Sequence, residues 1–208
     1  MIHRLHLAEV VYPAWHPNDG TGPVYAFAVT TPVGFFLIDT GIGPPHPRID
    51  ELYQPTRFPL DRALESAGLD PRHLRGIVLS HLHFDHVGNV QDFPGVPVFV
   101  QAAEWDAAQE PGYTIAAFVD APGIDYRLLA GDTELAEGIE VIATPGHTPG
   151  HQSVLVERTA LVAAQAFECS EDLTQEALSR LLPARAGNVS EIHLSHDHRV
   201  WRTGEHRP

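Results

Sequence analysis

The run from His81 to His86 constrains this chain more than any other feature of its sequence. It reads His-Leu-His-Phe-Asp-His, so three imidazoles and one carboxylate lie within six residues. Imidazole nitrogens and carboxylate oxygens are the ligands that zinc prefers in proteins. The run follows directly on the apolar segment 76–80, which has the pattern of a buried strand. The sequence therefore predicts a metal site on a loop that a rigid scaffold holds in place.

Polar side chains also follow other apolar segments of the chain. His147 lies in the turn after segment 138–144, Gln165 follows segment 160–164, and His196 follows segment 190–195. Asp39 ends the apolar segment 34–39 in the same way. Ligands of one metal site are commonly distant in sequence and adjacent in space. We therefore expect these strand ends to converge at one edge of the sheets.

Predicted strands and helices are mixed along the whole chain, which indicates layered α/β packing in a single domain over residues 1–208. Proline and glycine make segment 41–47 a predicted loop. Segment 112–125 is the least regular stretch, and it is either a loop over a binding cleft or a surface excursion. We expect strands at 24–31, 34–39, 77–80, 96–101, 138–144, 153–157, 160–163 and 190–195, and helices at 60–67, 85–90, 102–109 and 174–184.

The charge of the chain argues against a polyanionic partner. The formal net charge is −14, from 13 basic and 27 acidic residues, and the sequence contains no lysine. Because nucleic acids and anionic membrane surfaces are bound by clustered Lys and Arg, we expect neither as a partner.

No apolar stretch reaches the roughly 18 residues of a membrane span, and we find no signal peptide. With Cys169 as the only cysteine, no internal disulfide can form, and we expect a cytoplasmic protein.

Several motifs together resemble those of metallo-β-lactamase-fold hydrolases, and most closely those of the N-acyl-homoserine lactonases. The resemblance covers residues 22–197 and implies an α/β fold, the αβ/βα four-layer sandwich, with two mixed β-sheets packed face to face and helices outside. The fold motifs are Leu37-Ile-Asp-Thr-Gly41, Ser80-His-Leu-His-Phe-Asp-His-Val-Gly-Asn89, Thr144-Pro-Gly-His147 and Ser195-His-Asp197. The closer likeness to lactonases lies in 98–104, 126–132 and 145–153.

The resemblance also implies a set of metal ligands. Two zinc ions are implied, the first held by His81, His83 and His147. The second would be held by Asp85, His86 and His196. Gln165 is a further candidate metal contact, with a bystander role as the alternative. Asp39 is expected to support a ligand by hydrogen bonding, and His151 to be structural.

Two positions depart from the family pattern. Gln165 stands where the family has an Asp that bridges both metals, and Glu168 stands where the lactonases carry a Tyr. A Gln offers one carbonyl oxygen and no charge, so a close pair of dications should be held less firmly. Three outcomes follow: one of the two ions is lost or weakly held, Glu168 supplies the missing carboxylate, or the chain no longer hydrolyses a substrate.

The function that we expect is metal-dependent hydrolysis of a small lactone or ester by attack of a zinc-activated hydroxide. The favoured substrate is an N-acyl-homoserine lactone. Asp85 and Glu168 are the candidate catalytic residues. Another hydrolysis on the same fold, of a thioester or a β-lactam, is an alternative, and so is a binding or metal-storing relative without activity. The partner is a small molecule, and a homodimer is one option for assembly. Aromatic candidates for a substrate cleft are Trp15, Phe35, Trp105, Tyr113 and Phe118.

Overall fold

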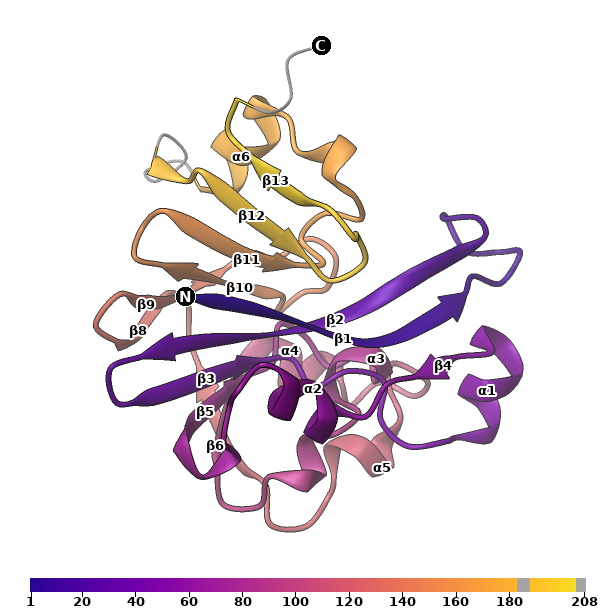
Figure 1. Ribbon diagram of the computed structural model, residues 1–208. Helices are drawn as coiled ribbons and strands as arrows, with labels where there is room; N and C mark the ends of the chain where they lie inside the picture. Colours follow the sequence, from indigo (N-terminus) through magenta and orange to yellow (C-terminus); the bar gives the residue numbers. More distant parts are fainter. Residues whose placement is uncertain (183–187, 205–208) are drawn as a thin grey trace.

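The computed structural model describes residues 1–182 and 188–204, and these form two mixed β-sheets packed face to face. Helices cover the outer face of each sheet, as Figure 1 shows. The layers are therefore helices, sheet, sheet and helices, and the predicted four-layer sandwich is confirmed.

The first sheet has seven strands in the order β4-β1-β2-β3-β5-β6-β7. Strands β3, β5, β6 and β7 run parallel to one another, whereas β1 pairs antiparallel with both β2 and β4. The strands are β1 Ile2–Val11, β2 Thr21–Thr31, β3 Gly34–Ile38, β4 Thr56–Arg57, β5 Leu74–Val78, β6 Pro97–Gln101 and β7 Asp125–Leu129. The helices between them are α1 Pro47–Tyr53, α2 Leu60–Ser66, η1 Pro71–His73, α3 Phe84–Val87, η2 Val90–Asp92, α4 Ala102–Ala107 and α5 Ala116–Val119.

The second sheet has six strands in the order β13-β12-β11-β10-β9-β8. In the part of this sheet that the structure describes, only β11 and β12 pair in parallel, because the short helix η3 and the helix α6 connect them across the outer face. The elements are β8 Thr133–Ala136, β9 Ile139–Ala143, β10 Gln152–Val156, β11 Ala160–Ala164, η3 Ser170–Asp172, α6 Gln175–Leu181, β12 Glu191–Leu194 and β13 Val200–Arg202.

The core consists of three apolar layers that match this architecture. Strand β2 shows why: Phe27 and Val29 pack between the two sheets, whereas Ala26 and Ala28 pack against the helices of the first sheet. Alternate residues of a strand face opposite sides, so a strand with two buried faces reads as a continuous apolar run. A third cluster, which includes Leu178 of α6, covers the second sheet. Burying each large apolar side chain contributes about 1.5–3 kcal/mol.

The strand directions explain why the candidate ligands meet. Parallel strands place their carboxyl ends at the same edge of a sheet, so the loops that follow β3 and β5 are neighbours. The same holds for Gln165 and His196, which follow the parallel strands β11 and β12. The turn between β9 and β10 brings His147 to this edge as well.

The structure departs from the sequence expectations in several elements. Segment 41–47 is a loop only up to Pro47, where α1 begins with the proline in its first turn. The expected helix at 85–90 is shorter, since α3 ends at Val87. Strands β1, β4, β7, β8 and β13 were not expected. The end of the expected helix at 174–184 lies outside the described residues, within which α6 ends at Leu181.

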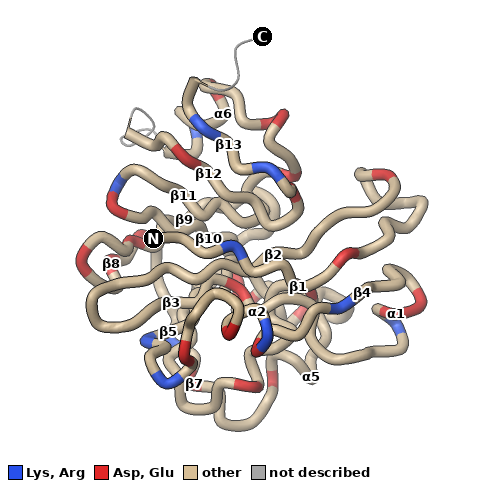
Figure 2. The backbone as a smooth tube through the Cα atoms, viewed as in Figure 1, with Lys and Arg blue, Asp and Glu red and all other residues tan. Residues whose placement is uncertain are grey.

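None of the helices in the described parts of the chain has the length and apolar character needed to cross a bilayer. Figure 2 shows that the basic positions are spread along the chain among the more numerous acidic ones.

Candidate metal centre

Two groups of ligand-type side chains lie at the edge where the strands end. We call His81, His83 and His147 the first group, and within it the ligand atoms all lie within 4.8 Å of one another. The Nε2 atom of His81 is 3.1 Å from Nδ1 of His83, and Nε2 of His147 is 3.2 Å from the same atom. Three ring nitrogens therefore face a common point.

The second group consists of Asp85, His86 and His196, again with ligand atoms within 4.8 Å of one another. Oδ2 of Asp85 lies 3.6 Å from Nε2 of His86 and 3.5 Å from Nε2 of His196. Helix α3 supplies the first two side chains, and the third lies two residues after β12.

Buried acceptors fix the rings of the second group. Nδ1 of His86 lies 2.8 Å from Oδ2 of Asp39, and Nδ1 of His196 lies 2.9 Å from the carbonyl oxygen of Pro23. Asp39 is itself held, since its other oxygen accepts from the backbone N–H of Ser80 at 2.7 Å. A histidine that donates through Nδ1 presents Nε2 as the free ligand atom. Asp39 thus has the supporting hydrogen-bond position that the sequence predicts.

The protonation states of the first group suit metal binding. Burial lowers the pKa of His81 well below its ordinary value and lowers that of His147 to about 3. Burial likewise lowers the pKa of His83. These rings are therefore neutral at physiological pH, which is the form that binds a metal.

The second group has a different electrostatic balance. Burial acts to lower the pKa of His86, but the carboxylates of Asp39 and Asp85 outweigh it, and with a contribution from Gln165 they raise the pKa to about 9. Burial would raise the pKa of Asp85, yet His86 and His196 hold it below its usual value. A metal bound here would therefore displace a proton from His86.

Unpaired nitrogens test whether these residues fit a metal. The Nε2 atoms of His86 and His196 are buried and have no hydrogen-bond partner within the described residues. A buried nitrogen without a partner is costly, and buried polar groups in native proteins are nearly always paired. Both atoms face Asp85, so a cation at this point would satisfy all three side chains. The donor sets of both groups, histidine with or without a carboxylate, suit zinc.

Gln165 and Glu168 lie beside both groups. Gln165 follows β11 directly and is 8% exposed. Its Nε2 donates to Oε1 of Glu168 at 3.1 Å, and the same carboxylate oxygen is 3.8 Å from Nδ1 of His147. The preceding Ala164 has φ 50°, a left-handed conformation that favours glycine. The structure thus brings every predicted ligand and catalytic candidate into one region.

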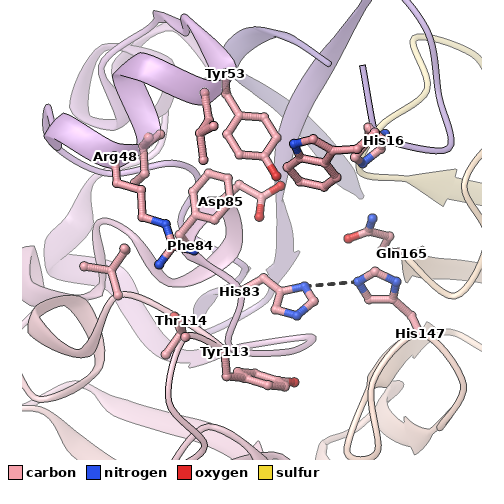
Figure 3. Close-up of a pocket in the computed structure, with 15 residues that line it drawn as sticks. His16, Arg48, Tyr53, His83, Phe84, Asp85, Tyr113, Thr114, His147 and Gln165 are labelled. Carbon is pink, nitrogen blue, oxygen red and sulfur yellow. Dashed lines mark hydrogen bonds between the residues drawn. The ribbon is translucent and has the colours of Figure 1, made fainter. Parts of the chain in front are cut away.

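A cavity of about 260 Å³ opens beside His83 and His147 of the first group and Asp85 of the second (Figure 3). His83, Asp85, His147 and Gln165 line it from the ligand side. Helix α1 supplies Arg48 and an apolar wall, the 112–115 segment supplies a second wall, and Trp15 with His16 comes from the β1–β2 loop. Of the two alternatives for segment 112–125, a loop over a cleft describes residues 112–115, whereas residues 116–119 form helix α5.

The predicted aromatic lining is correct in part. Trp15 and Tyr113 line the cavity. Phe35 and Phe118 instead belong to the core of the first sheet, and Trp105 packs against that core. The apolar residues that do line the cavity on α1 are Ile49, Leu52 and Tyr53, spaced three and four residues apart on one helix face.

Glu104 is a buried carboxylate that the sequence did not mark as part of the site. It accepts from the backbone N–H of Leu82 at 2.8 Å and from Oγ1 of Thr148 at 2.6 Å. It also accepts from the hydroxyl of Tyr113 and, at 3.2 Å, from the backbone N–H of Gly150. A Cβ on Gly150 would lie 2.1 Å from the backbone nitrogen of Glu104, so only glycine permits this approach. Glu104 therefore joins the His81–His86 loop, the His147 turn and the cavity wall.

Replacing Glu104 with glutamine should lower the free energy of unfolding by about 2–3 kcal/mol, because an amide cannot accept from four donors at once. Urea unfolding of the metal-free protein measures the effect. Glu110→Gln, at an exposed position nearby, is the matched control. An equal effect of the two changes would show that the Glu104 contacts add no stability.

Comparison with known proteins agrees with this geometry. The sequence pattern of the metallo-beta-lactamase superfamily matches residues 19–161. The chain belongs to this superfamily. It is 34% identical over 185 residues to an N-acyl homoserine lactonase from a Bacillus species, a match that covers 83% of this chain and 73% of the relative. It is also 34% identical to the N-acyl homoserine lactonase AttM from Agrobacterium fabrum, over 84% of this chain and 78% of that protein.

A solved structure shows the same fold. It is that of a point mutant of AiiA from B. thuringiensis with N-decanoyl-L-homoserine bound at the active site, and it matches the present chain with a TM-score of 0.78. The sequences are 24% identical, and the match covers 95% of this chain and 93% of that structure.

Proposed function

We propose that this protein is a zinc-dependent hydrolase that opens the ring of an N-acyl-homoserine lactone or a closely related lactone. The observation that carries the proposal is the pair of ligand groups beside one cavity, with the buried Nε2 atoms of His86 and His196, which lack a hydrogen bond within the described residues, facing Asp85. In this proposal the first group holds one zinc ion and the second group holds the other, with Gln165 adjacent to both.

The metal would supply Lewis acidity towards the carbonyl oxygen and would lower the pKa of a water molecule towards neutrality. The side chain of Asp85 faces the cavity and accepts the proton of the attacking water, as a general base. The water oxygen bonds to the carbonyl carbon, and the ring C–O bond breaks. Asp85 then returns the proton to the alkoxide that leaves, which gives a hydroxyl group and a carboxylic acid. The acid loses its own proton to solvent and becomes a carboxylate.

The substrate class rests on the relatives and on the cavity. The relatives named above are N-acyl homoserine lactonases, and AiiA binds an acyl-homoserine at its active site. The α1 wall of this cavity is apolar and suits an acyl chain. Arg48, which makes no hydrogen bond or ion pair within the described residues, reaches the cavity from the same helix (Figure 3) and can donate to an amide or lactone oxygen of the substrate.

A substrate panel on zinc-loaded protein tests the proposal. An N-acyl-homoserine lactone should be opened with a kcat/KM of about 10⁴ M⁻¹ s⁻¹ or higher, the lower end of the ordinary enzyme range. A thioester and a β-lactam should react more slowly. Faster turnover of either would indicate another hydrolase of this superfamily, and turnover of none would indicate a binding protein.

Other features stay predictions from the sequence. They are a single domain over residues 1–208, zinc as the native ion, a cytoplasmic location, and the absence of nucleic-acid and membrane partners. A homodimer also stays a prediction from the sequence.

A further inference from the structure

The orientation of the Gln165 amide is the starting point. Its nitrogen donates to Oε1 of Glu168 at 3.1 Å. Because a carboxylate only accepts hydrogen bonds, the amide nitrogen must face Glu168, and the amide oxygen must face the other way. Figure 3 shows this oxygen turned towards the cavity, beside His147 and across from Asp85.

The position of Glu168 is fixed from two sides. While Oε1 accepts from Gln165, Oε2 accepts from Nδ2 of Asn18 at 3.2 Å. Asn18 lies on the β1–β2 loop, which also carries Trp15 and His16 to the cavity. The carboxylate thus links the end of β11 to a loop of the other sheet.

Glu168 lies beside residues of both groups of ligands. Its Oε1 is 3.8 Å from Nδ1 of His147, the nitrogen on the side of the ring away from His83. Together with Asp85 and His196 of the second group, Glu168 also lines a small cavity. One carboxylate therefore borders both groups.

The number of negative charges around the two groups indicates what Glu168 contributes. Asp85 is the only acid within the two groups. Two dications in close proximity repel each other, and anionic ligands offset that repulsion. With a neutral amide at position 165, the repulsion between the two cations is not offset unless another carboxylate is near.

We propose that Gln165 and Glu168 together replace a single bridging carboxylate: the Gln165 oxygen would face the cations, and Glu168, hydrogen-bonded to Asn18 and to the Gln165 amide, would supply the negative charge. Glu168 is then a positioning residue that acts through Gln165 and His147. This inference rests on the metal centre proposed above, and it concerns how that centre is held.

A double-mutant cycle on metal binding tests the pair. Isothermal titration of metal-free protein with zinc gives the affinities of the wild type, Glu168→Gln, Gln165→Asp and the double variant. Glu168→Gln should weaken zinc binding by about 10- to 100-fold, the usual effect of losing a supporting partner. In the Gln165→Asp background the same change should have a much smaller effect, because the introduced carboxylate brings its own charge. Effects that agree within about twofold in the two backgrounds would overturn the proposal.

Two further variants separate position from charge. Asp19→Asn removes a carboxylate from the exposed end of the same loop, beside the surface hollow that Glu168 also lines. It should leave zinc affinity unchanged, and a loss equal to that of Glu168→Gln would reduce the effect to net charge and overturn the proposal. Asn18→Ala keeps the Glu168 charge but frees its position, and it should weaken binding by a smaller factor than Glu168→Gln. Circular dichroism verifies that each metal-free variant is folded.

The titration uses zinc alone, so its outcome is independent of the lactone assay. Tight zinc binding with the expected coupling would support the pair even if no lactone were opened. A wild type that binds no zinc would overturn both the pair and the proposed function.

Discussion

Replacing Asp85 with asparagine should lower kcat/KM for lactone opening by about 100- to 10,000-fold, the usual contribution of a general acid–base. Asparagine has the same shape but cannot accept the proton of the attacking water. It also removes the one carboxylate within the two ligand groups. Steady-state kinetics, together with zinc content measured on the same samples, checks the result.

The zinc content separates the two roles of Asp85. If the variant keeps both ions and loses activity, the proton-transfer role accounts for the loss. Asp92→Asn, at an exposed position after α3, is the matched control and should retain activity. Full activity of Asp85→Asn would exclude Asp85 as the base.

Stripping zinc from the loaded protein should lower Tm by about 5–10 °C. A ligand that binds only the folded state stabilises it by about 2.7 kcal/mol at a hundredfold excess over Kd. A chain of this size shifts by about 2–4 °C for each kcal/mol. The ligands come from loops that follow strands of both sheets, so binding opposes separation of the sheets. Differential scanning fluorimetry with and without a chelator measures the shift.

His147→Ala removes one ligand of the first group and should reduce the Tm shift. His73→Ala, at an exposed position at the end of η1, should leave the shift unchanged. If chelation changed the wild-type Tm by less than the scatter between replicates, metal binding would not be coupled to folding.

The strand ends that carry the site could be predicted because their signal is local. A short apolar run such as 76–80 marks a buried strand, and the polar residues that follow it must lie at its end. Strand β1 escaped prediction for a physical reason. Leu5 and Leu7 alternate with polar side chains as in a half-buried strand, but a β-bulge between His6 and Ala8 breaks the alternation and leaves only a short pattern.

The wall of the cavity was harder to predict than its metal-binding side. Proline at position 47 fits the end of a loop, but proline is also favoured in the first turn of a helix, where the structure has it. The spacing of Ile49, Leu52 and Tyr53 was the available signal for α1. Aromatic residues alone do not reveal whether they line a cavity or the core, and Phe35 and Phe118 lie in the core.

Contacts between distant segments left no local signal at all. Glu104 holds the loop at Leu82 and the turn at Thr148, and neither contact can be read from the residues around it. Gln165 and Glu168 are close in sequence, but their spacing of three residues does not by itself fix which way the amide points. Only the fold determines such partners.

The most direct test of the central claim is anomalous diffraction at the zinc edge, measured on crystals of the zinc-loaded protein. We predict two anomalous peaks, one among His81, His83 and His147 and the other among Asp85, His86 and His196. The absence of anomalous density from either position in crystals grown with excess zinc would contradict the account.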